Sequence, residues 1–492
     1  MSCGGAGTLP VLHPKLIANA LCAIAAAVGA AMLVPAAYSF LSAEGTTLAF
    51  SMPALGALAV GALLFFLTRT RVTYVARQDV FMIVVLGWIV AVAVGSLPFV
   101  LSGLMGPADA FFNSMAGFTT TGASTIRVPE EVAPSLLLWR SLSQWAGGIG
   151  IVVLFVAVAP VVGFGASQLY SAEVANPVSE RLTPHIRDTA KVLAYVYGGL
   201  TLGGLVALHL AGMGTFDAVN HALTTVSTGG YSTRSGSVGD FDSWAAELAI
   251  VAGMLLSGAN FALYFRAAQG RVVRTLLNRE LLAYLAIFAV GTLLVSASLY
   301  ALGYRDSLVV AFREALFQCA SLLTGTAFVT ADWGTWGPFS QGLLVLFMAV
   351  GGMGGSTTGG IKVIRTALLA SHARQQVFQM LHPQAVTPLR LGERIIPERL
   401  RTPLLGFFFV YVATLVVGTL LIALNGVAID AAFGSAFACL NLTGTFLGPA
   451  ADPGFYAGLP VSAKAILAVL MLLGRLELFT VLVLLAPAFW RG

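Results

Sequence analysis

Long apolar stretches alternate with short polar patches along almost the whole chain of 492 residues. Each apolar stretch has about 20 residues, the length that crosses a bilayer as an α-helix. Two of them, at about 16–38 and 48–68, come first. A pattern then occurs four times: a long apolar helix, a short amphipathic segment, a patch of Thr, Ser and Gly, and a second long apolar helix. We therefore predict ten spanning helices, eight of them in four internal repeats.

The predicted fold class is an all-α polytopic membrane protein. Two lead-in helices (1–75) precede four helix–pore-loop–helix repeats around one pore, at 76–170, 171–272, 273–385 and 386–492. We expect the second helix of the third repeat to be broken by a glycine-rich loop. Internal repeats in membrane proteins usually place a transport pathway at the interface between them.

Composition supports a membrane protein and excludes several other classes. The chain is 58% hydrophobic and only 10% charged, whereas soluble domains carry about 25% charged residues. The four cysteines are scattered without metal-ligand spacing, and no phosphate-binding GxxxxGK[ST] motif occurs. Basic residues are not interleaved with aromatics in a nucleic-acid-binding run. The first apolar run is longer than a signal-peptide core.

The distribution of basic residues predicts the topology. Basic residues cluster within 69–77, 181–191, 266–279 and 362–401, which all fall on one side if each repeat is helix, re-entrant hairpin, helix. That side is expected to be cytoplasmic, because cytoplasmic loops carry an excess of Lys and Arg. The pore loops then enter the membrane from the outer face.

The repeats can be aligned on an acidic residue that precedes Ala in each amphipathic segment. These acids are Asp109, Asp217, Glu314 and Asp430. We expect each near the start of a short helix, where the helix dipole favours negative charge. Thirteen residues later stand Gly122, Gly230 and Ala327 in the first three repeats, and Thr443, next to Gly444, in the fourth.

The aligned patches read "FTTTGAST", "TVSTGGYST", "SLLTGTAFVT" and "NLTGTFLG". Irregular backbone is tolerated at membrane depth only where it is buried in protein or lines a wet path. Carbonyl and hydroxyl oxygens from four such segments can replace the hydration shell of a monovalent cation. A divalent site would instead need converging carboxylates, and the patches contain none. The predicted ion-binding residues are Thr120, Thr121, Gly122, Thr228, Gly229, Gly230, Thr324, Gly325, Thr326, Ala327, Thr443, Gly444, Thr445 and Phe446.

Five blocks of sequence, in order, carry a family resemblance. They are "SMAGFTTTGAS", "LWRSLSQWAGGIGIVVL", "TTVSTGGYST", "GGMGGSTTGGIKVIR" and "LMLLGRLELFTVLVLL". Over nearly its whole length the chain resembles the Trk/Ktr/HKT superfamily of cation transporters, specifically its pore-forming TrkH/TrkG type. The resemblance implies potassium uptake across a bacterial inner membrane, with K⁺ as the transported ion and no bound cofactor. It also implies a homodimer in membrane lipid and a cytoplasmic nucleotide-binding regulatory ring of TrkA type.

The resemblance further implies one glycine-bearing filter segment from each repeat. The filter glycines fall on Gly122 and Gly230, whereas the third position falls on Ala327. The fourth falls on Phe446, unless the register slips and Gly444 serves. An Ala side chain hinders a positive φ angle, and a Phe narrows one quarter of the ring. We therefore expect weakened selectivity for K⁺, and a poorly selective Na⁺/K⁺ pathway stays open as an alternative.

Two features of the sequence, a glycine-rich run and an arginine in the last predicted helix, indicate a gate in the pathway. The run "GGMGGSTTGG" at 351–360 interrupts a predicted helix, since each Gly costs about 1 kcal/mol relative to Ala. It resembles the family's gating loop, and the alternative is a helix-packing seam of small residues. The glycines are Gly351, Gly352, Gly354, Gly355, Gly359 and Gly360. Lys362 directly after them is either a gate contact or a positive-inside residue.

Arg475 is a charge in the middle of the last predicted helix. Such a charge is costly in lipid and usually faces a cavity or a partner. It matches a family arginine that projects into the pore below the filter. A local ion pair with Glu477 is the alternative, but residues two apart do not share a helix face.

Two other functional classes are weaker. An ion-coupled secondary transporter of an organic solute predicts inverted repeats, whereas these repeats are direct. An intramembrane enzyme needs catalytic or metal-ligand sets in mid-helix, and we predict that the chain is not an enzyme. Coupling of K⁺ to Na⁺ or H⁺, as in a symporter, is left open by the sequence.

Overall fold

The computed structural model describes residues 12–68, 76–162, 186–383, 390–391, 394–395, 401–452 and 454–491. Arg69, Arg71 and Arg181, on which the topology prediction partly rests, lie outside these ranges. The chain forms two compact units. Unit 1 is Met1–Ser114 with Leu476–Gly492, and unit 2 is Met115–Arg475.

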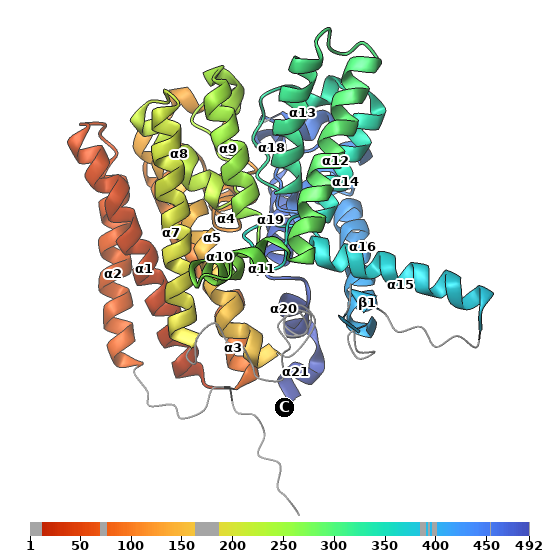
Figure 1. Ribbon diagram of the computed structural model, residues 1–492. Coiled ribbons are helices and arrows are strands. Elements are labelled where there is room, and N and C mark those ends of the chain that lie inside the picture. The colour runs from red at the N-terminus through yellow and green to blue at the C-terminus, as the bar shows by residue number, and fades with distance from the viewer. Residues whose placement is uncertain are drawn as a thin grey trace, which may run out of the picture. The chain divides into compact units, whose positions relative to one another are not determined.

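Unit 1 contains the lead-in helices and the first helix of the first repeat. Its elements are α1 (Pro14–Leu41), α2 (Thr47–Leu67), α3 (Arg77–Leu101), the first part of α4 (Pro107–Phe118), α20 (Phe479–Leu482), η6 (Val483–Leu485) and α21 (Pro487–Arg491). α1 and α2 run side by side (Figure 1). Small residues allow their close approach, because a methyl group on Gly61 would lie 3.0 Å from the Ala26 Cβ.

A buried carboxylate joins α1 to α3. Asp79 is fully buried and accepts hydrogen bonds from the His13 backbone N–H (2.8 Å) and the Ala76 N–H (3.0 Å). Its other close partner is the His13 imidazole Nδ1, 2.7 Å away. Asp79 thus caps the start of α3 and fixes the start of α1 against it.

Unit 2 contains the rest of the four repeats. Its elements are the end of α4, η1 (Pro129–Glu131), α5 (Pro134–Val162), α7 (Ile186–Leu210), α8 (Thr215–Val226), η2 (Ser237–Phe241), α9 (Trp244–Ser257), α10 (Phe261–Ala268), α11 (Val272–Leu276), α12 (Arg279–Ala301), α13 (Leu308–Leu323), η3 (Trp333–Thr335), α14 (Pro338–Val350), α15 (Val363–Leu381), β1 (Arg390–Leu391), β2 (Arg394–Ile395), α16 (Arg401–Ala423), α17 (Ile429–Leu440), η5 (Gly448–Ala451), α18 (Phe455–Gly458) and α19 (Val461–Arg475).

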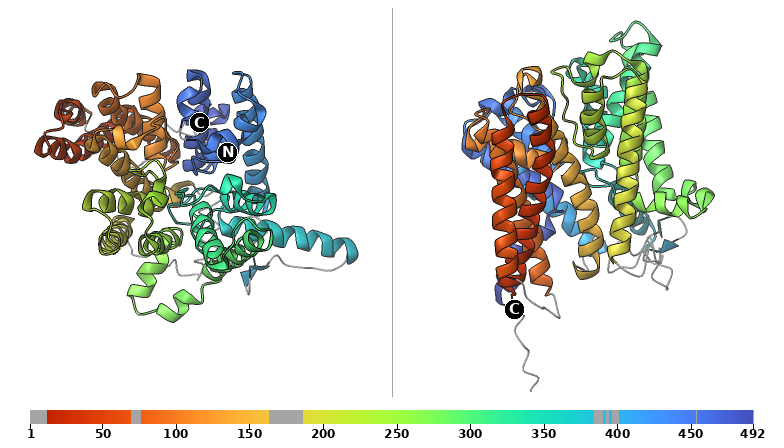
Figure 2. Two further views of the ribbon diagram at one scale, coloured as in Figure 1. Left: turned by 90° about the horizontal axis from the view of Figure 1, so that it is seen from above. Right: turned by 90° about the vertical axis from the view of Figure 1, so that its left-hand side faces the viewer.

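These helices follow the predicted repeat order. The short helices α4, α8, α13 and α17 each precede an irregular loop, and a second helix of the repeat follows: α5, α9, α14 and α19. Neighbouring repeats touch in chain order, because α5 packs on α8, α9 on α13 and α15 on α16. Seen from above, the helices of unit 2 lie in this order around a common centre (Figure 2).

The expected ten spans fall on α1, α2, α3, α5, α7, α9–α10, α12, α14, α16 and α19–α20. By length and composition, six helices of the described residues can each cross a membrane, and two broken pairs raise the number to eight. α14 has only 13 residues because it ends at the glycine-rich run. α5 is long enough at 29 residues, but the structure describes only part of its side chains.

One break was not predicted. α9 and α10 are bent by 91° over a short gap. Two backbone bonds to the glycine-rich run stabilise the gap: the Met353 N–H donates to Gly258 O (2.9 Å), and the Phe261 N–H donates to Gly355 O (3.3 Å). The run thus satisfies polar groups that the interrupted helix exposes.

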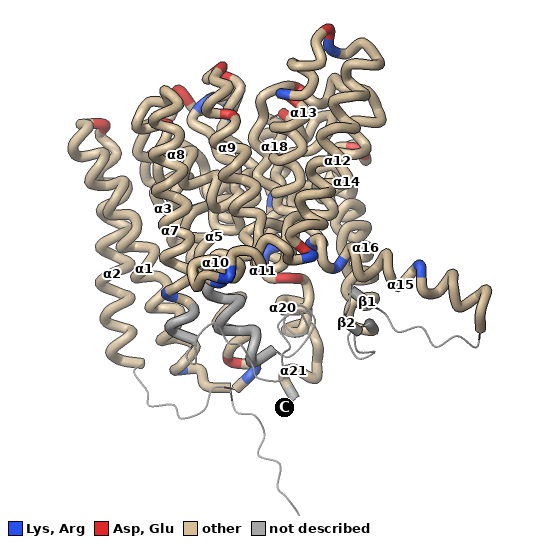
Figure 3. The backbone as a smooth tube through the Cα atoms, viewed as in Figure 1, with Lys and Arg blue, Asp and Glu red and all other residues tan. Residues whose placement is uncertain are grey.

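The outer surface fits a lipid environment. Large apolar side chains stay exposed along α2 and α16, among them Phe66 and Phe409 at 69% and 74%. Such surface is unfavourable in water and favourable against acyl chains. In unit 2, Lys and Arg gather around α10, α11 and α15 (Figure 3). The chain is therefore a membrane protein with a basic end.

We predict that Asp79→Ala destabilises the protein by about 2–3 kcal/mol, because it leaves the His13 and Ala76 donors without their charged partner. Thermal denaturation in detergent measures the change. Asp306→Ala is the matched control, since Asp306 is exposed. Equal melting temperatures for both variants would contradict a stabilising role for Asp79.

Candidate functional site

The four short helices end in the same way. The residue after each helix is polar, and its side chain donates to the carbonyl four residues back. These pairs are Thr119 to Met115 (2.6 Å), Ser227 to Leu223 (2.9 Å), Thr324 to Ala320 (2.8 Å) and Asn441 to Phe437 (2.9 Å). Sequence reasoning placed only Thr324 in the site. Thr119, Ser227 and Asn441 could have been found from the sequence by their constant spacing. Each stands three residues before Gly122, Gly230 or Gly444.

Each loop then contains two residues with positive φ, spaced two apart. The first are Thr120 (φ 56°), Thr228 (54°), Gly325 (70°) and Leu442 (58°). The second are Gly122 (φ 83°), Gly230 (75°), Ala327 (59°) and Gly444 (63°). Because non-glycine residues rarely adopt this conformation, its occurrence at eight equivalent positions defines one shared loop geometry.

Backbone hydrogen bonds fix the register independently. The amide of the second left-handed residue bonds to the carbonyl six residues back in all four loops. The bonds are Gly122 to Ala116 (3.3 Å), Gly230 to Thr224 (3.4 Å), Ala327 to Ser321 (3.3 Å) and Gly444 to Ala438 (3.3 Å). The amide of the first left-handed residue bonds three residues back in each loop, so the helices close with a Schellman-type turn.

This register corrects the fourth repeat. Gly444, not Phe446, is equivalent to Gly122. The spacing from Asp430 is fourteen residues rather than thirteen, so counting alone reached Thr443. The Phe446 ring packs on Phe437 and Phe433, with ring centroids 5.3 and 6.0 Å apart. Phe446 therefore lines the back of the loop and does not narrow the ring.

The third repeat keeps the shared geometry without a glycine at its second position. Ala327 adopts φ 59°, although its methyl group hinders this conformation. Gly325, with φ 70°, is the first left-handed residue of this loop, directly after Thr324, the C-cap of α13. The glycine and the larger residue have exchanged places relative to the first repeat.

Another alignment residue differs from expectation. Glu314 does not lie at the start of its helix, since α13 begins at Leu308. Its carboxylate pairs with Arg305 at 2.7 Å. Asp109, Asp217 and Asp430 do lie in the first turns of α4, α8 and α17.

The four loops close on one another. A methyl group on Gly122 would overlap Gly229 O, one on Gly230 would overlap Thr326 O, and one on Gly444 would overlap Thr121 O. Gly325 lies against the fourth loop, with its Cβ position 3.6 Å from Leu442 O. Each loop therefore contacts the next, and the fourth contacts the first. The ring brings together thirteen of the fourteen predicted ion-binding residues, all except Phe446.

Side chains of α5 hold the second loop. Gln144 Nε2 donates to Gly229 O (2.7 Å), and the Tyr231 N–H donates to Gln144 Oε1 (3.2 Å). The Tyr231 hydroxyl donates to Ala123 O (3.0 Å) and so joins the second loop to the first. The side-chain amide of Gln144 thus makes one hydrogen bond on each side of the left-handed Gly230.

A cavity of about 230 Å³ adjoins the ring, and we refer to it as the vestibule. The second left-handed residue of every loop lines it, together with side chains such as Arg140 and Asp452. Glu130 anchors its rim by accepting hydrogen bonds from the Ser235 N–H (2.7 Å) and Oγ (2.6 Å). Burial raises the pKa of Glu130, but these hydrogen bonds outweigh it and leave the pKa lowered.

On another side of the ring lies the glycine-rich run. Residues 351–362 are not helical, so the predicted break is confirmed. Three glycines, Gly351, Gly355 and Gly360, have positive φ. Gly359 is in contact with Asn441 O at the fourth loop, and the Thr228 hydroxyl of the second loop donates to Thr357 Oγ1 (3.2 Å).

Arg475 reaches this run. It is the last residue of α19 and not a mid-helix residue, because residues 476–478 form a turn. Its Nη1 donates to Thr357 O (2.7 Å) and its Nη2 to Gly147 O of α5 (2.8 Å). The side chain is 3% exposed. One guanidinium thus joins the fourth, third and first repeats through carbonyl oxygens.

Lys362 also contacts the run rather than an open surface. Its Nζ donates to Thr358 O (2.7 Å) and Thr358 Oγ1 (3.2 Å), and the residue is 6% exposed. Of the two interpretations from the sequence, the geometry matches the contact with the loop.

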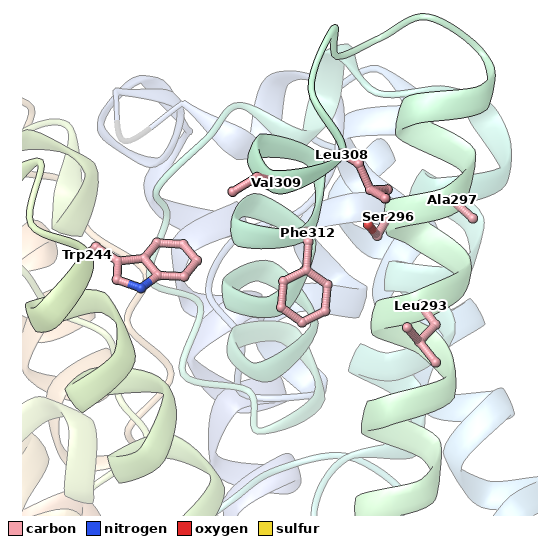
Figure 4. A pocket seen from close by; sticks show the side chains of 7 residues that line it. All are labelled: Trp244, Leu293, Ser296, Ala297, Leu308, Val309 and Phe312. Carbon is pink, nitrogen blue, oxygen red and sulfur yellow. The ribbon is translucent and has the colours of Figure 1, made fainter.

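A larger cavity of about 420 Å³ lies elsewhere in unit 2. Trp244, Leu293 and Phe312 are among the side chains that surround it, and they come from α9, α12 and α13 (Figure 4). Its lining is almost wholly apolar and offers no set of oxygens to an ion. The ring of loops is therefore the better candidate for an ion site.

Comparison with known proteins decides the family. The profile described as "TrkH: Cation transport protein" matches residues 50–491. The chain belongs to the TrkH family. It is 37% identical to the Trk system potassium uptake protein TrkH of Salmonella typhimurium over 464 residues, 94% of this chain and 96% of the relative. It is 31% identical to the Trk system potassium uptake protein TrkG of Escherichia coli, over 94% of this chain and 95% of the relative.

The fold agrees. The crystal structure of the potassium transporter TrkH from Vibrio parahaemolyticus superposes with a TM-score of 0.90 at 36% identity, covering 97% of this chain and 99% of that one. The all-α polytopic fold and the TrkH/TrkG-type resemblance are thereby confirmed. As a member of the TrkH family, the chain is a transport protein and not an enzyme.

We predict that two substitutions in the ring differ in their effect on stability. Gly230→Ala destabilises the protein strongly, because the added methyl group overlaps Thr326 O. Ala327→Gly is stabilising or neutral, because it relieves about 1 kcal/mol of left-handed strain while increasing the freedom of the unfolded chain. Melting temperatures in detergent measure both. A Gly230→Ala variant as stable as the wild type would contradict the close packing of the loops.

Proposed function

We propose that this TrkH-family chain mediates potassium uptake by channel-like passage of K⁺ through the ring of four loops. The observation that carries the proposal is the closure of the loops, each with two left-handed residues in one register. Left-handed residues spaced two apart reverse the usual backbone direction and can turn carbonyl oxygens toward one side of the loop. A monovalent cation can exchange its water for such oxygens. The potassium transport named for the two relatives and the crystallised protein supports K⁺ as the ion.

The same geometry supports selectivity for K⁺. The expectation of weak selectivity rested on Ala327 and Phe446. Ala327 keeps the shared backbone conformation, and Phe446 lies behind the loop. We therefore favour a K⁺-selective filter over a poorly selective Na⁺/K⁺ pathway. The membrane potential supplies about 2.3 kcal/mol per charge per 100 mV for uptake.

We also propose that Arg475 and the glycine-rich run form the gate. The guanidinium bridges Thr357 O and Gly147 O, and this places a positive charge beside the ring. A cation passing there meets that charge until Arg475 or the run moves. The six glycines of the run, with Lys362 holding its end, provide backbone able to rearrange. The contact between Thr228 and Thr357 links the filter and the gate.

The location, orientation, partners and repeat boundaries of the chain are also proposals. We assign the chain to the bacterial inner membrane, with pore loops entering from the outer face and the basic end in the cytoplasm. We propose that a TrkA-type nucleotide-binding subunit moves the gate from that side, and that the chain forms a homodimer. The repeat boundaries at 76–170, 171–272, 273–385 and 386–492 are proposed on the same basis.

Uptake measurements test the proposed function. Liposomes containing the protein are expected to take up K⁺ and Rb⁺ along an imposed negative potential, and Na⁺ at least about tenfold more slowly, if the oxygens of the ring discriminate by about 1.4 kcal/mol. Ala327→Gly is expected to leave the K⁺/Na⁺ ratio within about twofold, since its backbone already has the shared conformation. Equal K⁺ and Na⁺ fluxes would contradict selectivity. No cation flux, with or without a regulatory subunit, would contradict the function.

Arg475→Gln is expected to raise Rb⁺ flux about tenfold or more, because a bond from a charged group to a carbonyl contributes about 1.5–3 kcal/mol to the closed arrangement. Lys464→Gln is the matched control. It removes a buried positive charge from the same helix, but its Nζ donates to Ala457 O, away from the run. Flux that stays unchanged in Arg475→Gln, or rises equally in both variants, would return Arg475 to a structural role.

A further inference from the structure

A second buried arginine lies at the vestibule. Arg140 of α5 lines the cavity and is only 3% exposed. Its Nη2 donates to Ser124 Oγ (3.0 Å), and its guanidinium carbon stacks 4.0 Å from the centre of the Tyr231 ring. Within the described part of the chain, Nε and Nη1 have no hydrogen-bond partner. Buried charges are normally paired, so this one needs an explanation.

The vestibule does not neutralise this charge. Its charged lining residues are Arg127, Arg140, Arg234 and Asp452. Arg234 is 46% exposed at its side chain and pairs with Asp217 at 3.3 Å. Arg127 is exposed to solvent. Arg140 forms no ion pair with a carboxylate among the described residues, so its charge is buried and is not neutralised by an opposite charge.

This charge acts on ions at the ring. The same cavity is lined by Gly122, Gly230, Ala327 and Gly444, the second left-handed residues of the four loops. An ion that enters the ring from the vestibule therefore passes Arg140. Buried charges are screened by salt much less than exposed ones. The electrostatic work of bringing up a cation is proportional to its charge, so a divalent ion meets twice the barrier of a monovalent one.

We propose that Arg140 is a specificity-determining residue that keeps divalent cations out of the mouth of the filter. The inference rests on the proposed passage of monovalent cations through the ring. Monovalent cations gain enough from the oxygens of the ring to overcome the repulsion. Divalent cations, which bind oxygen sites more strongly and would block the ring, are repelled twice as strongly.

The test is inhibition of Rb⁺ uptake by Ba²⁺, which has nearly the size of K⁺ and twice its charge. Liposomes contain the wild type or Arg140→Gln, and Ba²⁺ is added on the vestibule side. If the half-saturating Rb⁺ concentration falls about threefold in Arg140→Gln, the half-inhibitory Ba²⁺ concentration is expected to fall about tenfold, since the logarithmic shift doubles with charge. Arg140→Met should give the same relation through a different neutral side chain.

Two controls separate charge from structure. Arg140→Lys keeps the charge and should leave Ba²⁺ inhibition within about twofold of the wild type, since the Coulomb interaction is retained. Arg127→Gln removes an exposed charge from the same cavity and should also change it by less than about twofold, because water and salt screen that charge. The K⁺/Na⁺ ratio should be unchanged in Arg140→Gln.

Several outcomes overturn the inference. One is unchanged Ba²⁺ inhibition in conducting Arg140→Gln and Arg140→Met variants. A second is an altered K⁺/Na⁺ ratio in Arg140→Gln, together with equal shifts in the half-saturating Rb⁺ and half-inhibitory Ba²⁺ concentrations. That result would make Arg140 a structural support of Tyr231. A third is a change in wild-type inhibition when gluconate replaces chloride, which would mean that a bound anion neutralises Arg140. No Rb⁺ uptake by the wild type would overturn the proposed function and this inference with it.

Discussion

The ring of four loops depends on how four short helices end. An α-helix leaves its last carbonyl groups without partners, and here a left-handed residue lets the following amides return to them. The second left-handed residue repeats the reversal two positions later. The chain then passes beside the next loop so closely that glycine is required at Gly122, Gly230 and Gly444. The packing between the loops, the contacts of the glycine-rich run and the vestibule are all arranged around these helix ends.

The four loops carry equal backbone strain from left-handed residues. Each has two left-handed positions and places one glycine and one larger residue there, in either order. In the third loop the glycine comes first, at Gly325, and the larger residue is Ala327. A left-handed non-glycine residue costs about 1–2 kcal/mol, so each loop carries one such cost rather than two. The contacts between neighbouring loops offset it, and this explains how the ring tolerates different sequences with one backbone geometry.

Much of this was predictable from the sequence. The fold class followed from apolar length, and counting from Asp217 located Gly230 because α8 has no insertion before its end. The same count failed for the fourth repeat, where one extra residue separates Asp430 from Gly444. The conformation of Ala327 was missed because a propensity argument sees the methyl group and not the neighbouring loops that hold it. The end of α19 at Arg475 and the bend after α9 also depend on contacts between distant segments, which no local pattern encodes.

Asymmetry distinguishes the proposed gate from the proposed filter. The ring draws equally on four repeats, whereas the bridge of Arg475, Thr357 and Gly147 draws on three of them. A symmetric ring suits an ion that is bound from all sides. An asymmetric bridge suits the proposed gate, because movement of the Arg475 guanidinium alone breaks both of its bonds.

The central claim is that a cation binds within the ring, and anomalous diffraction from crystals grown in Rb⁺ tests it most directly. The account predicts an anomalous peak enclosed by backbone oxygens of all four loops, near Thr121, Gly229, Thr326 and Thr443. Anomalous density found elsewhere in the protein, with none inside the ring, would contradict it.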